Sequence, residues 1–197
     1  MTEPEAFDLW TWPKCQEKIS SLAGHLGFPK GKTLQFLGFE LDLANGKVTD
    51  KILNTTLDPP PKHLFFLLYR YSEAKETPLT GELVSFRQVP GGRIYNSVFE
   101  GRVVMPIASR LGKTPERFRL AAEALDGRKL TQGDIGFTIH ALPLIPLSYI
   151  LWNADDEFPA RVQVLMDRSV SHYIDAEPLT HLAALTSKRL LVLAEKI

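Results

Sequence analysis

The chain has 197 residues, of which 44% are hydrophobic and 23% are charged. This supply of apolar residues is enough for one folded domain with a buried core, so we do not expect disorder in the bulk of the chain. Its 23 basic and 23 acidic residues balance. The chain therefore lacks the basic surplus typical of nucleic-acid binding, and we expect no nucleic-acid partner.

Cysteine content and hydropathy bear on the compartment. Cys15 is the only cysteine, so the chain cannot form an internal disulfide or hold an iron–sulfur cluster by itself. The acidic N-terminus has no apolar core of a signal peptide. The longest apolar stretch, 141–152, contains two prolines and is too short to cross a bilayer. We therefore expect a cytoplasmic protein with no membrane partner.

The first quarter of the chain predicts an arm, a helix and a hairpin. Residues 1–13 form the expected N-terminal arm, anchored by its two tryptophans, and 14–197 form the expected single domain. Apolar residues from Cys15 to Leu26 recur at helical spacing. Residues 36–43 alternate as in one strand, Asn45-Gly46 predicts a turn, and Val48 begins the returning strand.

The middle of the chain predicts further helices around one strand. Pro61 suits the first turn of a helix whose residues 64–69 are apolar on all sides. Residues 84–89 predict a strand closed by a Pro-Gly-Gly turn. Residues 95–111 have helical character that Pro106 should interrupt. Thr114-Pro115-Glu116 is a helix start, and Gly127 is the matching stop.

The last third of the chain defines the fold class. Residues 134–167 alternate in three segments, which predict an antiparallel three-stranded unit. A helix begins near Asp175 and keeps one apolar face to the end. We therefore expect an α+β single domain in which antiparallel β-strands pack with several helices, including a long C-terminal helix.

The acidic triplet Asp155-Asp156-Glu157 is the first candidate site. In an extended chain Asp155 and Glu157 share one face, about 6–7 Å apart. Two such carboxylates can hold a hard cation such as Mg²⁺ or divide into a general acid and a general base. Equally, the triplet can be a solvated turn, or pair with Arg161 or Arg168.

A basic turn, 87–93, is the second candidate. Its Pro-Gly-Gly sequence can expose backbone N–H groups, and Arg87 and Arg93 can clamp a carboxylate or a phosphate. A plain hairpin-type turn is the alternative. Nucleotide-binding fingerprints, metal-ligand spacing of histidines and a nucleophile elbow are all absent from the sequence. The cofactor therefore stays unknown, and no metal site is indicated.

Several short motifs occur in one order along the chain. They are SFRQVPGG at 85–92 followed by Tyr95 and Phe99, Gly133-Asp134, LPLIP at 142–146, Trp152, DDEFP at 155–159 and LMDRS at 165–169. The set resembles an uncharacterised prokaryotic family, Domain of Unknown Function 3786, over most of the chain. Arg87, Asp134, Trp152, Glu157 and Asp167 fall on its motif positions.

The family resemblance implies no established activity. Relatives fused to an iron–sulfur cluster domain imply a setting of anaerobic redox or corrinoid metabolism. With a single cysteine, this chain would need a redox partner protein to supply any cluster. The resemblance, together with the two turns, predicts the ligand-binding residues Arg87, Gly91, Gly92, Arg93, Asp134, Trp152, Asp155, Asp156, Glu157 and Asp167.

Three functional hypotheses follow. The first is a non-catalytic binding or accessory domain, with a pocket between the basic and the acidic turn for a small-molecule ligand or a partner protein. The second is a carboxylate-dependent, metal-assisted hydrolase or lyase that uses Asp155, Glu157 and either His140 or His172. The third is a structural homo-oligomer formed through exposed faces of the last helix.

Overall fold

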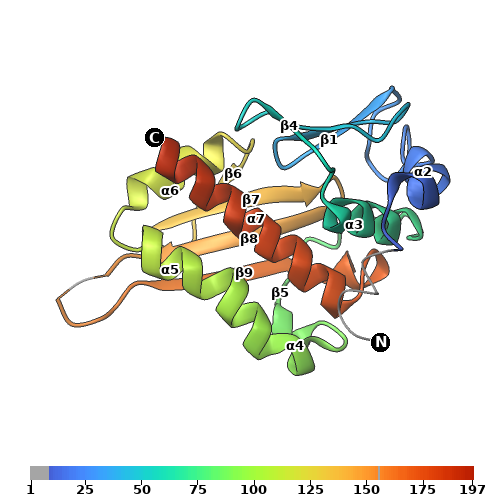
Figure 1. Ribbon diagram of the computed structural model, residues 1–197. Helices are drawn as coiled ribbons and strands as arrows, with labels where there is room; N and C mark the ends of the chain where they lie inside the picture. Colours follow the sequence, from blue (N-terminus) through green and yellow to red (C-terminus); the bar gives the residue numbers. More distant parts are fainter. Residues whose placement is uncertain (1–8, 155) are drawn as a thin grey trace.

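Two antiparallel sheets and a set of helices make up the computed structural model, which describes residues 9–154 and 156–197 (Figure 1). The larger sheet has the strand order β5-β9-β8-β7-β6, and the smaller has the order β1-β2-β3-β4. This architecture confirms the α+β class. None of the helices in the described part of the chain is long and apolar enough to span a membrane.

The larger sheet is built on the three-stranded unit that the sequence predicts. Its long strands alternate between a face that contacts helices and a face with more polar side chains, as is common in antiparallel sheets. The register pairs Trp152 with Arg161, and Tyr149 with Val164. The strands are β5 (Leu83–Ser85), β6 (Arg128–Leu130), β7 (Ile135–Leu142), β8 (Ile145–Trp152) and β9 (Arg161–Asp167).

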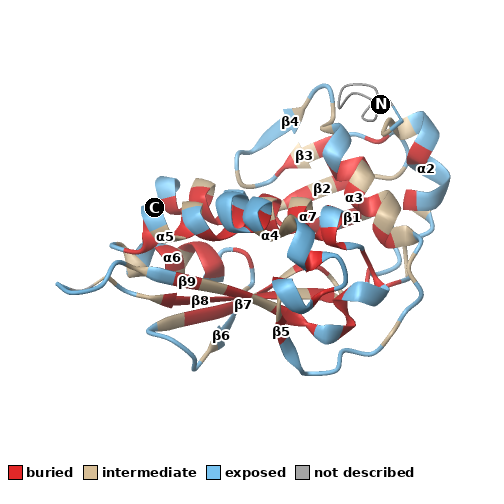
Figure 2. Cartoon of the chain, turned by 90° about the horizontal axis from the view of Figure 1, so that it is seen from below, coloured by how far each residue is buried: buried red, intermediate tan, exposed pale blue. Residues whose placement is uncertain are grey.

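The C-terminal helix α7 (Ala176–Lys196) lies across one face of this sheet. Beside it on the same face run α4 (Gly92–Phe99), α5 (Met105–Leu111) and α6 (Pro115–Glu123), as Figure 2 also shows. The Tyr149 hydroxyl donates to the Ala183 carbonyl at 3.2 Å. Little of the α7 surface stays exposed, because most residues of the helix are buried within the domain.

The smaller sheet corrects one prediction. Residues 36–43 are not one strand, because the chain reverses at Leu37-Gly38, both in the left-handed region with φ of 48° and 74°. That turn joins β1 (Thr33–Phe36) to β2 (Phe39–Asp42). The meander then continues, through the predicted turn at Asn45-Gly46, to β3 (Val48–Asp50) and β4 (Thr55–Leu57).

Two helices near the N-terminus, α2 (Trp12–Ser20) and α3 (Lys62–Ser72), pack against each other next to the smaller sheet. The two tryptophans dock on α3, as predicted: Trp10 meets Phe66 at 5.0 Å and Trp12 meets Phe65 at 5.8 Å between ring centroids. The first helix thus begins inside the predicted arm, of which residues 1–8 lie outside the described part.

Two further segments differ from expectation. The strand predicted for 84–89 ends at Ser85, and residues 86–88 form a 3-10 helix, η1 (Phe86–Gln88). The helix predicted for 95–111 begins earlier and contains a π-helical segment, η2 (Glu100–Val104), directly before α5. Pro106 lies in the first turn of α5, where its missing N–H is tolerated, so the helix is interrupted but not ended.

A buried ion pair connects α7 to the smaller sheet. The Arg189 guanidinium donates to both carboxylate oxygens of Asp50, at 2.6 and 2.7 Å, and to the Leu37 carbonyl at 2.9 Å. It also lies 4.1 Å from the Phe39 ring centroid. Burial by itself raises the pKa of Asp50, but the hydrogen bonds from Arg189 and from nearby backbone amides outweigh burial and lower it.

Removing one partner of this pair should destabilise the domain strongly. We expect Asp50→Ala to lower the free energy of unfolding by about 3–5 kcal/mol, because it leaves the Arg189 charge buried without a partner. Urea denaturation followed by circular dichroism measures the loss. Arg110→Ala is the control, since it breaks the exposed pair Arg110–Glu195, which joins α5 to α7. Equal losses in the two variants would contradict the account.

Candidate functional site

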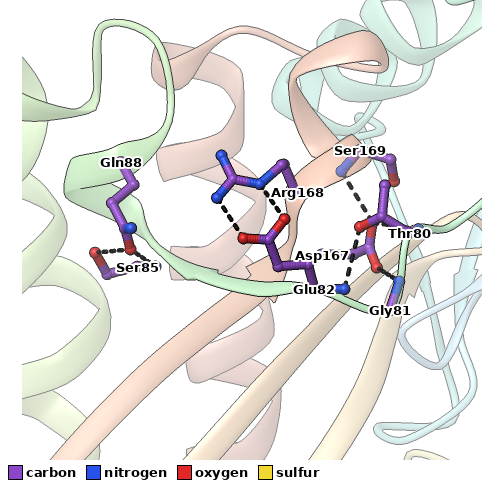
Figure 3. A network of polar contacts seen from close by, with 8 residues as sticks. All are labelled: Thr80, Gly81, Glu82, Ser85, Gln88, Asp167, Arg168 and Ser169. Atoms are coloured by element: carbon purple, nitrogen blue, oxygen red, sulfur yellow. Dashed lines mark hydrogen bonds and ion pairs between the residues drawn. The ribbon is translucent and has the colours of Figure 1, made fainter.

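The loop before β5 is fixed by the Asp167 carboxylate at the end of β9 (Figure 3). Asp167 accepts hydrogen bonds from the Thr80 amide and hydroxyl, both at 3.0 Å, from the Gly81 amide at 2.7 Å and from the Ser169 amide at 2.9 Å. Burial by itself raises the pKa of Asp167, but these donors outweigh it and lower the pKa to about 2. The carboxylate is therefore engaged by its own chain.

A second set of contacts fixes where β5 ends. Arg168 pairs with Glu82 at the start of the β5–β9 ladder, and the Arg168 amide donates to the Glu82 carbonyl at 2.9 Å. At the other end, the Gln88 side-chain oxygen accepts from the Ser85 amide at 2.8 Å and from its hydroxyl at 2.9 Å. This local bonding turns the chain into η1. As a result, β5 pairs with only residues 165–167 of β9.

The Pro-Gly-Gly turn that follows needs both glycines. Gly91 has φ of 76°, and a Cβ on Gly92 would lie 1.9 Å from the Phe86 carbonyl oxygen. The Phe86 ring stacks on Phe99 of α4, with centroids 4.1 Å apart. The turn therefore clamps α4 onto η1, and this places Arg87 between the end of β5 and the helix.

A groove of about 360 Å³ lies beside Arg87. One wall is the part of β9 that β5 leaves uncovered, and the other is the helical stretch α4–η2–α5. Both walls carry apolar and polar residues, and the lining residues are Ser85, Phe86, Arg87, Asn96, Phe99, Glu100, Val104, Met105, Ala108, Ala160, Arg161, Val162, Gln163 and Val164.

The polar side chains of this groove are not used to hold the fold. Within the described part of the chain, the side chains of Arg87, Asn96, Glu100 and Gln163 form no hydrogen bond or ion pair, and Arg161 forms only a cation–π contact with Trp152 at 5.4 Å. Two guanidinium groups face one carboxylate, so the groove carries a net positive charge. Such an arrangement attracts an anionic group and can bind it bidentately.

The other predicted site residues lie elsewhere. The Asp134 carboxylate accepts from the Asn153 amide at 2.8 Å, which fixes the turn before β7. Trp152 lies under Arg161, just outside the groove lining, and Arg93 is exposed on α4, away from it. Asp156 and Glu157 belong to the β8–β9 connection and do not line the groove. Asp155 lies outside the described residues. The groove therefore does not join the basic and acidic turns.

Four polar or charged lining residues were not among the predicted site residues: Asn96, Glu100, Arg161 and Gln163. Asn96 and Glu100 lie on a helix face and Gln163 alternates with valines in β9, so each has the pattern of an ordinary surface residue. No local signal marks them, because the groove is formed by segments about 70 positions apart. Only the pairing of β5 with the far end of β9 brings them together.

The groove has no obvious catalytic group. Among the described residues, its lining contains no histidine, cysteine or aspartate, Glu100 is its one carboxylate, and the Ser85 hydroxyl is bonded to Gln88. The two histidines of the enzyme hypothesis lie apart from it: His140 Nδ1 is 2.8 Å from the Pro143 carbonyl, and His172 lies beside Asp175 in another hollow. Among residues 9–154 and 156–197, no three His, Cys, Asp or Glu side chains are arranged to hold a metal ion.

A larger hollow of about 570 Å³ lies at the N-terminal end of the domain. Trp10, Trp12, Phe65 and Pro59 give it a mainly apolar lining, and Lys47 and Lys62 stand among the lining residues. Its shape depends on the segment at 10–13, which precedes α2 and begins it. The Arg87 groove, by contrast, is built wholly from the central sheet and its helices.

The fold and groove define an α+β domain with a polar groove at an open strand edge. The family model of "Domain of unknown function (DUF3786)" matches residues 21–189, and the chain belongs to this family. Every residue of the Arg87 groove falls within the match, whereas residues 10–13 of the larger hollow fall outside it. Searches of the curated proteins and of the solved structures each returned no match.

Asp167 should make stability depend on pH. The pKa of Asp167 is lower in the folded chain than in the unfolded chain, where it is about 3.9. Its contribution to the free energy of unfolding is therefore complete above about pH 4 and is lost as the pH falls towards 2. We expect Asp167→Asn to cost about 2–3 kcal/mol at pH 7 and progressively less in acid. Urea denaturation at pH 7 and at pH 3 measures the loss of stability under each condition. The same difference in unfolding free energy between variant and wild type at both pH values would contradict this role.

Gly92 should tolerate no side chain. We expect Gly92→Ala to destabilise by about 1–3 kcal/mol, because its Cβ would overlap the Phe86 carbonyl and push α4 away from η1. Thermal unfolding measures the effect. Gly101→Ala is the control, since a Cβ at Gly101 meets no atom within 4 Å. A Gly92→Ala variant as stable as Gly101→Ala would show that the turn is not the clamp described.

Proposed function

We propose that this chain is a non-catalytic binding or accessory domain whose ligand enters the Arg87 groove with a carboxylate group. The observation that carries the proposal is the pair of arginines, Arg87 and Arg161, lining one groove and free of any acidic partner in the described part of the chain. Guanidinium groups bind carboxylates by paired, charge-assisted hydrogen bonds.

The contrast among the family-motif residues supports this reading. Asp167 and Asp134 hold the chain's own backbone, the two glycines meet steric demands, and Trp152 stacks with Arg161. Arg87 is exposed and has no such structural contact, although the motif around it is rigidly held. An exposed arginine on a rigid support is suited to recognising a ligand.

The groove favours binding over catalysis. A carboxylate bound between Arg87 and Arg161 would meet the amides of Asn96 and Gln163 and an apolar wall, but no nucleophile or general base apart from Glu100. The size of the groove is near the lower end for small-molecule sites, which are commonly about 300–1,000 Å³. A link to anaerobic redox or corrinoid metabolism, implied by the family resemblance, stays a prediction.

Small carboxylates test this proposal directly. We expect glutarate and citrate to shift the NMR amide signals of Arg87 and of residues 161–164, and neutral glutaramide to leave them unchanged. Arg87→Gln should weaken this binding at least about tenfold, because one charge-assisted contact contributes about 1.5–3 kcal/mol.

Arg93→Gln is the matched control, since Arg93 belongs to the same turn but does not line the groove. It should bind both carboxylates as the wild type does. If Arg87→Gln and Arg93→Gln behave alike, or if no carboxylate shifts the groove signals of the wild type, the proposal is wrong.

A further inference from the structure

The edge of β9 next to the groove has no strand beside it. In the described part of the chain β9 pairs with β8 over residues 161–166, but with β5 only at residues 165–167. Residues 161–164 therefore have a strand neighbour on one side only. The same residues line the groove: Arg161 is exposed, Gln163 is half-buried, and Val162 and Val164 are buried. An uncovered strand edge is a template for pairing with another chain.

Two hydrogen bonds show which backbone groups face this edge. The Asp134 amide donates to the Leu151 carbonyl, so the odd-numbered residues of β8 direct their backbone groups towards β7 and the even-numbered ones towards β9. Because Trp152 pairs with Arg161 and Ile150 with Gln163, the odd-numbered residues of β9 bond to β8.

The even-numbered residues of β9 consequently face the other side. The bond from the Arg168 amide to the Glu82 carbonyl agrees with this alternation. Next to Val162 the chain of β5 has already turned away into η1. The N–H and C=O of Val162 thus point towards the groove that Arg87 also lines.

We infer that the natural occupant of the groove is an extended peptide segment of a partner protein, which adds a strand to β9 at Val162 and places a carboxylate on Arg87. This inference rests on the proposed function and names its ligand class. The backbone edge supplies pairing that needs no particular side chain, the apolar residues of the helix wall accept alternate side chains, and the arginines select an acidic residue or a C-terminal carboxylate.

The edge also lacks three of the features that normally prevent such pairing. Proline, lysine and a bulge are the usual protections of exposed strand edges, and none of them occurs in β9, whose sequence is RVQVLMD. The basic side chains that line the groove here are Arg87 and Arg161, and the Arg161 guanidinium lies over the Trp152 ring. An acidic peptide therefore meets an open ladder with complementary charge.

Binding of defined peptides to the full chain tests the inference. The probes are two pools of heptapeptides, one containing Asp and Glu and one without them, each made with free and with amidated C-termini. We expect the carboxylate-bearing pools to bind, and bound peptide to slow hydrogen exchange at the Val162 amide. Binding of the amidated acidic pool would indicate an acidic side chain as the bound group, and binding of the acid-free pool with free C-termini would indicate the C-terminal carboxylate. Equal binding of the acid-free, amidated pool would overturn the role given to Arg87.

A proline at position 162 tests whether a peptide binds through backbone hydrogen bonds to β9 or through side-chain contacts alone. Val162→Pro removes the N–H that faces the groove but none that bonds to β8. Val162→Ala is the control, because it shortens the same side chain and keeps the N–H. We expect at least a tenfold weaker peptide affinity for Val162→Pro than for Val162→Ala. Equal affinities, or an unchanged Val162 exchange rate on peptide binding to the wild type, would overturn the inference.

Binding of the small carboxylates distinguishes a failure of the peptide inference from a failure of the proposed function. If glutarate binds the wild type at Arg87 while every peptide pool fails, the ligand is a small molecule and the inference is wrong, but the binding site stands. If glutarate and the peptides both fail, the proposed function is wrong as well.

Discussion

The buried contact between Arg189 and Asp50 determines how the two halves of this domain fit together. The guanidinium uses its donors on two carboxylate oxygens and one backbone carbonyl, so only one placement of α7 against the smaller sheet satisfies all of them. A buried ion pair of this kind adds little net stability compared with apolar packing, but it strongly disfavours arrangements that leave either charge alone.

The position of α7 then determines the rest of the helical layer. Because α7 occupies the middle of the larger sheet, α4, η2 and α5 lie along its side, next to β9 (Figure 1). The Ser187 hydroxyl donates to the Val103 carbonyl at 3.1 Å, which ties α7 to the π-helical segment. The groove beside Arg87 is the space that remains between this helical stretch and the uncovered end of β9. It is thus a consequence of the whole fold.

Much of this fold follows from sequence patterns, and the exceptions have local causes. The periodicity of α7, the start of α6 at Pro115 and the alternation of β7 and β9 are strong signals that the structure confirms, although the Thr114 side chain makes no capping hydrogen bond. The reversal at Leu37-Gly38 could not be seen, because leucine rarely adopts positive φ and the apolar alternation ran through it. The end of β5 at Ser85 depends on a side-chain bond from Gln88 that competes with the ladder.

The site was predictable only in part, and for a similar reason. Arg87 was indicated by its turn and by the family motif, but its neighbours Asn96, Glu100 and Gln163 come from tertiary contacts that no spacing reveals. The motif also contains residues such as Asp167 that support the backbone, and a sequence alone does not separate them from residues that bind. The structure separates them by showing which polar groups already have partners.

Hydrogen exchange along β9 in the free protein tests the central claim most directly, namely that the edge beside Arg87 is open. If the account is correct, the Val162 amide exchanges much faster than that of Gln163, which bonds to β8 within the same strand. If Val162 exchanges as slowly as Gln163, its N–H already has a partner and the groove cannot accept a ligand strand.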